Sequence, residues 1–431
     1  MKNIFYTTLI LLSFSNLQAQ VQTNEELKSL ITHSFGYFPQ IKEIENTVET
    51  ARQKLEIVKT NNPEVSGNAA YTYLKPKIVI PFPTGSGGQL QDFQFAPVNN
   101  INTSVDASYT LLDFGRLKAD VEKAKNDLKY STDNVENVKQ QLAFQVATIY
   151  YNIVYLQKAI GIQDSVLVYL EENRKIISSK LQNGDAIKLD LLNIQSSIDA
   201  EQNRKADLKN DLQKQLDLLA YTTGIDQATG KNFDFDLALQ DSTTALAAAI
   251  ANNTDFTLAQ DKINQAKADV AIAKLLDRPY VSLHGSAGFK NGYVPAVGED
   301  RFNYNAGVSL KIPIYSGGKT KKQVILDQNL VKQNELAVES LQNNYRKDIA
   351  QSLSDIATDN ERIQNTRGQI EEALAAEQIA ESRYKNGVGT NLEITNASTN
   401  VERAELTRLQ YEYQLCLAKV TLAKLLGYTY W

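Results

Sequence analysis

Side chains that could carry catalytic or metal chemistry are scarce in this chain of 431 residues, which has two histidines, His33 and His284, and one cysteine, Cys416. Zinc sites combine several His, Cys or acidic ligands. The composition therefore offers little from which to build a metal or nucleophile site. We expect no metal, no cofactor and no enzymatic activity. One cysteine also excludes an intrachain disulfide.

One segment imitates a nucleotide-binding loop. The sequence Gly-Gly-Lys-Thr at 317–320 resembles the end of the G-x-x-x-x-G-K-[ST] motif, but that motif requires glycine where this chain has Pro313. The equivalent segment 114–117, 203 positions earlier, lacks the Lys-Thr pair. We therefore interpret the glycines as strand-to-helix turns, namely Gly115, Gly317 and Gly318.

The chain is internally duplicated. Five landmarks recur 203 positions later without a gap, as the pairs Gly115 and Gly318, Asn183 and Asn386, Gly184 and Gly387, Asn193 and Asn396, Gly224 and Gly427. Upstream, 63–66 corresponds to 279–282 at an offset of 216, because the first copy carries a longer insertion. Solenoid repeats are far shorter, about 20–50 residues. Each copy is predicted to be helix, strand, strand, very long helix, turn, helix. The expected boundaries are 20–224, an inter-repeat equatorial segment at 225–254, and 255–431.

The N-terminus predicts export. Lys2, an apolar stretch at 4–12 and a Leu-Gln-Ala ending at 17–19 are typical of a secretory signal at 1–19. The alternative, a membrane anchor, requires about 20 apolar residues in a row, and no stretch of the chain supplies them. The net charge is −5, and no basic block stands out, which disfavours nucleic acid as a partner.

Apolar periodicity predicts long, packed helices. Apolar residues are spaced 3-4-3-4-3, the coiled-coil seam pattern, at Ile41, Ile44, Val48, Ala51, Leu55 and Val58. The second copy repeats this spacing 215 positions later. After Gly115, an apolar residue every seven positions continues from Val121 to Leu156, and helical character extends to about residue 181. Such a helix is on the order of 100 Å long. A secreted or periplasmic coiled-coil structural or adhesion protein would show the same heptads.

Alternation of apolar and polar residues predicts strands. From Phe302 to Lys311, aromatic and aliphatic residues alternate with Asn, Gly, Ser and Lys, and similar alternation occurs in 281–290 and 104–111. Each such strand has one apolar and one polar face. Segments of about ten alternating residues are typical of membrane barrels, although a soluble sheet packed on one face alternates identically.

Counting the strands suggests a shared barrel. Each copy supplies two strands, so one chain offers four, whereas about eight are needed to close a small barrel. Open strand edges are not tolerated in lipid. If the strands cross a membrane, several chains must contribute to one barrel. The link between Tyr73 and Ile101 is rich in Pro, Gly and Gln and suits an outward-facing loop.

These features together resemble the TolC-like outer-membrane efflux proteins over nearly the whole mature chain. The resemblance is carried by Leu-Asp-Phe-Gly-Arg at 112–116 and Tyr-Ser-Gly-Gly-Lys at 315–319, by Asn183-Gly184 with 190–193, and by 384–387 with 393–397. It implies an α+β membrane protein, with a long α-helical barrel and a transmembrane β-barrel shared between three chains. Each protomer would contribute four strands.

The resemblance also implies function. Such a homotrimer is a passive exit duct in the outer membrane that extends into the periplasm. It works with a periplasmic adaptor protein and an inner-membrane transporter, in efflux or type I secretion. The implied pore gate is Asp190, Glu393 and Asn396, although the family has an acid at the Asn396 position and an arginine where this chain has Gly389. Two acids near helix starts are equally consistent with simple dipole stabilisation.

The same resemblance places the adaptor-docking tips at the two turns between long and short helix. These expected docking residues are Asn183, Gly184, Asp185 and Ala186 in the first copy, and Asn386, Gly387, Val388 and Gly389 in the second.

Overall fold

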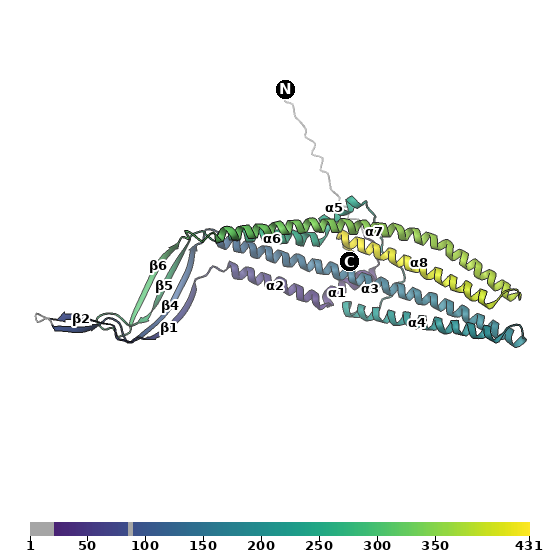
Figure 1. Ribbon diagram of the computed structural model, residues 1–431, viewed down its shortest axis with the longest axis horizontal. Helices are drawn as coiled ribbons and strands as arrows, with labels where there is room; N and C mark the ends of the chain where they lie inside the picture. Colours follow the sequence, from purple (N-terminus) through teal and green to yellow (C-terminus); the bar gives the residue numbers. More distant parts are fainter. Residues whose placement is uncertain (1–20, 85–88) are drawn as a thin grey trace, which may run out of the picture. The chain divides into compact units, whose positions relative to one another are not determined.

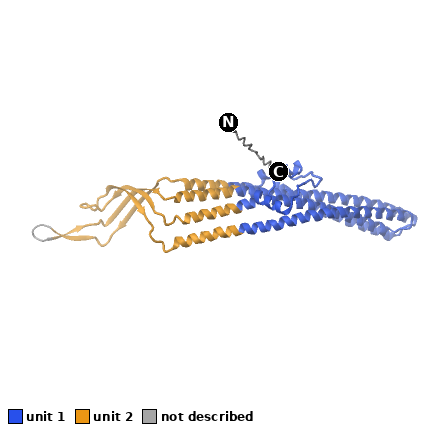
Figure 2. Cartoon of the chain, turned by 90° about the horizontal axis from the view of Figure 1, so that it is seen from above, with its two compact units in different colours: residues 1–46, 133–258, 337–431 blue, residues 47–132, 259–336 orange. Residues whose placement is uncertain are grey.

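The computed structural model describes residues 21–84 and 89–431, so the expected signal peptide at 1–19 lies outside the described residues. The chain divides into two compact units (Figure 2). Unit 1 holds residues up to 46, 133–258 and 337–431, and unit 2 holds 47–132 and 259–336.

Unit 1 is helical, and its longest elements are the two very long helices that the heptads predicted. Helices α3 (Arg116–Asn183) and α7 (Lys319–Lys385), which begin in unit 2, span 68 and 67 residues. Each reverses at its C-terminal end into a helix of 36 residues, α4 (Lys188–Thr223) or α8 (Asn391–Leu426). Figure 1 shows these two reversals. The predicted end of the first long helix, at about residue 181, is confirmed within two residues.

A short helix precedes the next helix in each repeat. Helix α1 (Glu25–Tyr37) leads into α2 (Pro39–Lys59), and α5 (Ser242–Asn252) leads into α6 (Thr254–Ala273), which begins 215 positions after α2. Side-chain oxygens of Asn24 and Asp241 cap the short helices by accepting backbone N–H groups. Helix α5 therefore occupies part of the segment 225–254 that we placed between the repeats.

Two apolar clusters hold unit 1 together. The larger contains buried residues of α1, α3, α5, α7 and α8, with Tyr150 and Tyr151 of α3 fully buried and Cys416 of α8 among them. The predicted seam residues Leu142, Ile149 and Leu156 are all buried. The smaller cluster lies close to the reversals and takes residues from four helices: Leu170, Ile177, Ile194, Ile198, Ala380, Tyr384, Ile394 and Ala397.

Unit 2 contains an antiparallel sheet of four strands in the order β1-β4-β5-β6, two from each repeat as predicted. The strands are β1 (Glu64–Tyr73), β4 (Asn99–Leu112), β5 (Tyr280–Lys290) and β6 (Arg301–Lys311). The β4–β5 pairing joins the two repeats. On one face Phe289 meets Phe302 edge to face, and on the other Ser282 bonds Ser309 at 2.7 Å. The sheet is therefore amphipathic, and β1 and β6 are its edges.

The link between Tyr73 and Ile101, which we expected to be an outward-facing loop, contains two strands that the sequence did not indicate. It contains a hairpin of β2 (Val79–Thr84) and β3 (Gln89–Gln94), which forms its own two-stranded sheet. The prolines at 81 and 83 obscured the strand, because proline cannot donate to a ladder. A two-stranded ribbon accepts them, since every second amide points away from the partner strand. The chain thus has six strands among its described residues, four of them in the larger sheet.

A polar junction connects strand β4 to helix α3. Gly115, at φ +97°, lies between them, and the Asp113 carboxylate accepts N–H groups of Gly115 (3.0 Å) and Leu117 (2.5 Å). The Arg116 guanidinium donates to the carbonyls of Leu275, Leu276 and Arg278 at 2.5–3.1 Å. These three carbonyls lie in the turn that follows α6, which ends at Ala273, so Arg116 fixes the path of the chain between α6 and β5. In the second copy Gly317 and Gly318, at φ +65° and +75°, precede Lys319, which is exposed.

We predict that Arg116→Gln destabilises the protein by about 2–4 kcal/mol, because a hydrogen bond from a charged donor contributes about 1.5–3 kcal/mol and water replaces part of the two exposed bonds to Leu276 and Arg278. The matched control is Lys319→Gln, at the equivalent position of the second repeat, which should leave stability nearly unchanged. Thermal unfolding followed by circular dichroism in detergent measures both. Equal effects of the two variants would contradict this role of Arg116.

Candidate functional site

The two helix reversals are built by glycines in left-handed backbone. Gly184, at φ +84°, follows α3, and the N–H of Asp185 donates to the carbonyl of Lys180 at 2.8 Å. Gly387, at φ +75°, follows α7. A side chain at positive φ is strained, which explains glycine at both expected docking tips. The four-residue tips at 183–186 and 386–389 both lie at these reversals.

Arg383 organises the second reversal. Its guanidinium pairs with the Glu393 carboxylate at 3.3 Å and donates to the Val388 carbonyl at 3.2 Å. A Cβ at Gly389 would lie 2.9 Å from the Arg383 Cβ and 2.9 Å from the Tyr384 nitrogen, so only glycine fits there. The TolC-like proteins that this chain resembles have an arginine where it has Gly389. In this chain Arg383, six residues before Gly389, supplies the guanidinium that pairs with Glu393.

The expected gate residues Asp190 and Glu393 occupy the first turns of α4 and α8, and Asn396 lies in the second turn of α8. The Asp190 carboxylate accepts the N–H of Ile187 at 3.3 Å, and Thr390 accepts the N–H of Glu393 at 3.3 Å. Glu393 and Asn396 are exposed, and Asp190 is half-buried. Acids in a first turn are favoured by the helix dipole. Both acids therefore have local structural partners, and a role in a pore is an additional proposal.

The two reversals are tied to each other. The Lys180 ammonium donates to the Tyr384 carbonyl at 2.6 Å and lies 4.0 Å from the centre of the Tyr384 ring. The Asn391 side chain donates to the Asp190 carbonyl at 3.4 Å. Together with the smaller apolar cluster, these contacts bring the first turns of α4 and α8 side by side. Neither Lys180 nor Asn391 was identified from the sequence, because no periodic pattern marks them.

Large apolar side chains are exposed around the reversals. Ile187, Leu189 and Leu192 on the first hairpin, and Val388 and Leu392 on the second, are 57–66% exposed. Apolar groups gathered at one surface mark sites of interaction. The tips therefore combine fixed backbone geometry with an apolar surface.

The polar face of the sheet carries its own hydrogen-bond network. The Asp106 carboxylate on β4 accepts from Asn68 on β1 and from Ser104 at 3.0 Å. His284 on β5 lies over Gly307 on β6, where a Cβ would be 2.5 Å from its Nε2 atom. Asn68 and His284 are exposed, and Ser104 and Asp106 are half-buried.

Over residues 21–84 and 89–431, no three His, Cys, Asp or Glu side chains are grouped so that they could hold a metal ion. In these same ranges, no helix has the length and hydropathy needed to cross a bilayer.

An amphipathic sheet attached to long reversing helices defines a class of solved outer-membrane channel proteins. The chain aligns with the structure of CusC at a TM-score of 0.77 and 18% identity, covering 94% of this chain and 93% of that one. It aligns with VceC of Vibrio cholerae at 0.74 and 15% identity, covering 93% and 96%. These likenesses show the fold.

Sequence comparison identifies the family. Outer membrane efflux protein BepC of Brucella suis is 22% identical over 75% of this chain and 71% of that protein. Cation efflux system protein CusC of Escherichia coli is 20% identical over 77% and 74%. The sequence profile described as "Outer membrane efflux protein" matches residues 39–224 and 245–428. The chain belongs to this family of outer-membrane efflux proteins. The predicted family and the predicted outer-membrane location are therefore confirmed. The alternative, a coiled-coil structural or adhesion protein, is not supported.

Proposed function

We propose that the chain is one protomer of a homotrimeric exit duct, which carries cargo passively across the outer membrane and the periplasm. The observation that carries this proposal is the four-stranded amphipathic sheet with free edges at β1 and β6. Four strands cannot close a barrel, and unpaired edges are excluded from lipid. Three copies supply twelve strands, with the Asp106 face toward water and the Phe289 face toward lipid.

The stoichiometry is tested by the mass of the purified protein. Light scattering in detergent, corrected for bound detergent, should give three protomers per particle. Planar bilayers containing this material should show discrete channels. A monodisperse monomer that retains its full β content by circular dichroism would contradict the proposal.

In such a trimer, Asp190 and Glu393 line the narrowest part of the duct. Rings of carboxylates in a narrow aqueous pore attract cations and repel anions. Support comes from the contacts that bring the first turns of α4 and α8 together, so that both acids of a protomer lie at one level of the helices. Asn396, exposed one turn after Glu393, belongs to the same wall.

We predict that Asp190→Asn with Glu393→Gln lowers the cation preference of the channel, measured as a reversal potential across a salt gradient. The effect should fade in concentrated salt, because the Debye length falls from about 10 Å at 0.1 M to about 3 Å at 1 M. Glu25→Gln with Glu49→Gln is a control of equal charge change on exposed helix positions of α1 and α2. If the double variant keeps the wild-type ion selectivity at low salt, the two acids only stabilise the starts of their helices, and the proposed role in the pore is wrong.

The tips are proposed to dock a periplasmic adaptor protein, which connects the duct to an inner-membrane transporter. The glycine reversals surrounded by exposed apolar side chains support this assignment, since apolar side chains gathered at a surface mark interaction sites. The cargo would then be selected by the transporter, and the duct would not discriminate chemically.

Replacing Gly184 and Gly387 by leucine should abolish export while trimers still form. Both positions require positive φ, although a Cβ at either would meet no neighbouring atom, so the damage is confined to the turn. Gly36→Leu is the control, because it also meets nothing within 4 Å but has no positive φ. Export of a dye substrate from intact cells is the readout. Export that survives both tip changes would place docking elsewhere.

A further inference from the structure

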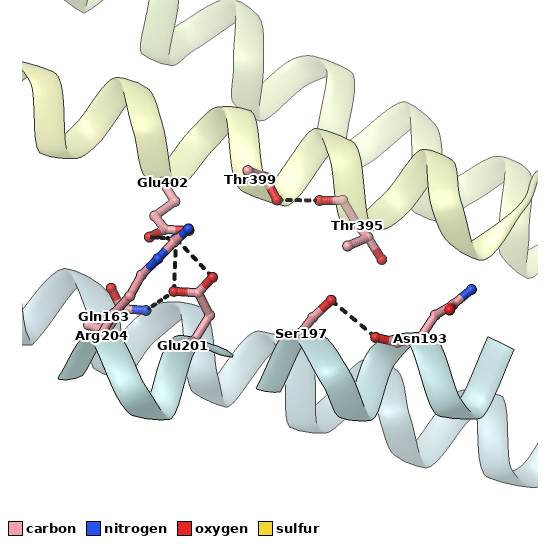
Figure 3. Close-up of polar contacts among 8 residues, drawn as sticks. All are labelled: Gln163, Asn193, Ser197, Glu201, Arg204, Thr395, Thr399 and Glu402. Carbon is pink, nitrogen blue, oxygen red and sulfur yellow. Dashed lines mark hydrogen bonds and ion pairs between the residues drawn. The ribbon is translucent and has the colours of Figure 1, made fainter. Parts of the chain in front are cut away.

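A buried charged cluster joins α4 to α8 away from the tips. The Arg204 guanidinium on α4 contacts Glu201 at 2.9 and 3.1 Å and Glu402 on α8 at 3.2 Å. Gln163 on α3 donates to Glu201 at 2.5 Å. Figure 3 shows Glu402 and Glu201 converging on Arg204 from opposite helices. We call these four residues, Gln163, Glu201, Arg204 and Glu402, the Arg204 cluster.

The cluster has more negative than positive charge. The side chains of Glu201 and Glu402 are 11% and 4% exposed, whereas that of Arg204 is 57% exposed. A buried carboxylate is costly unless it is paired. One guanidinium therefore neutralises two buried carboxylates that face each other from different helices, and it is what allows them to lie close together.

Two other polar side chains near the cluster, Ser197 and Thr399, bond within their own helix. The Ser197 hydroxyl donates to the Asn193 carbonyl at 3.2 Å on α4, and the Thr399 hydroxyl donates to the Thr395 carbonyl at 2.9 Å on α8 (Figure 3). These bonds do not cross from α4 to α8. The contact between Arg204 and Glu402 does.

We propose that Arg204 is a positioning residue of the channel, which holds α4 against α8 through Glu201 and Glu402 and thereby sets the separation of the acidic first turns of these helices. Asp190 lies 11 residues before Glu201, about 16 Å along the helix. Release of the cluster would let the ends of α4 and α8 move apart. The proposal rests on the proposed function as a duct.

The proposal predicts that Arg204→Gln loosens the contact between α4 and α8 more than Glu402→Gln does. Arg204→Gln removes the guanidinium that contacts both buried carboxylates, so Glu201 and Glu402 repel across the helix interface with only the charge of Arg403 acting on Glu402. Glu402→Gln removes the cross-helix ion pair but leaves Arg204 on Glu201, so nothing repels. The double variant Arg204→Gln/Glu402→Gln removes the repulsion as well.

Single-channel conductance of the purified protein in planar bilayers tests this ordering. Arg204→Gln should raise conductance above the wild-type value, because breaking a buried pair leaves an uncompensated charge; Glu402→Gln should raise it less, and the double variant should return to the Glu402→Gln level. A role in packing alone predicts that the double variant is at least as affected as Arg204→Gln. Wild-type conductance in Arg204→Gln, or no return in the double variant, overturns the proposal. If Arg204→Gln yields no trimer, Glu402→Gln with wild-type conductance also overturns it.

Arg362→Gln is the matched control. Arg362 pairs with the buried Asp359 at 3.2 Å, with side-chain exposures of 49% and 6%, and stacks over Tyr411. It therefore connects α7 to α8 within one hairpin and does not reach α4. Its substitution should leave conductance unchanged. A rise equal to that of Arg204→Gln would mean that any lost buried pair opens the channel.

The pH response separates electrostatics from packing. Burial raises the pKa of Glu402, the Glu201 charge raises it further, and Arg204 and Arg403 lower it; Gln163, on α3, carries no charge. Because the raised pKa means that the packed state favours protonated Glu402, packing strengthens as pH falls through that pKa. The conductance of Arg204→Gln should therefore fall toward wild type as the pH is lowered from neutral through the raised pKa of Glu402. The double variant should not respond. A flat profile for Arg204→Gln overturns the proposal.

Failure of the proposed function remains distinguishable. If the wild-type protein forms no trimer and no channel, the duct itself is wrong. If wild-type channels form and Arg204→Gln behaves as wild type, the duct stands and only the positioning role of Arg204 is lost.

Discussion

A peptide group in lipid has no water to bond with, and the rest of the structure depends on this constraint. Four strands leave the outward amides and carbonyls of β1 and β6 without neighbours in the described sheet. Within the proposed trimer, β1 of one copy would pair with β6 of the next. The duplication serves the same constraint, because each repeat adds two strands and one helical hairpin. Closure of the barrel and closure of the helical tube then require the same number of copies.

The helical unit uses a different balance of forces. Its interior near the tips is apolar, as Ile194, Ile198 and Ile394 show, and apolar burial is not directional, so it does not by itself fix the separation of the helices. Charged groups are added at two levels, with Lys180 and Arg383 at the reversals and Arg204 farther along. Ion pairs depend more on geometry than apolar contacts do. Ion pairs can therefore hold these helices in one arrangement and still allow the helices to change position when the pairs break.

The sequence predicted the parts of the molecule that repeat. Alternation found β4, β5 and β6, heptads found α3 with its buried Leu142 and Ile149, and the shared offset placed Gly184 and Gly387 at equivalent reversals. It missed what occurs once. The β2–β3 hairpin is masked by its prolines, and Arg383, Lys180 and Arg204 form contacts across helices that no local period encodes. Pairs such as Arg204 and Glu402, 198 residues apart, are defined only by the packing of the folded chain.

The single cysteine has a practical consequence. Cys416 lies in the large apolar cluster at 3% exposure, and burial raises the pKa of its thiol. Reagents that target thiols react with the thiolate, so the native protein is nearly inert toward them. Any cysteine introduced at a surface position becomes the sole reactive handle, without prior removal of the native residue. Three symmetry-related labels per proposed particle would then serve as a spectroscopic ruler, and the opening of the helical end could be followed as a change in the distance between identical probes.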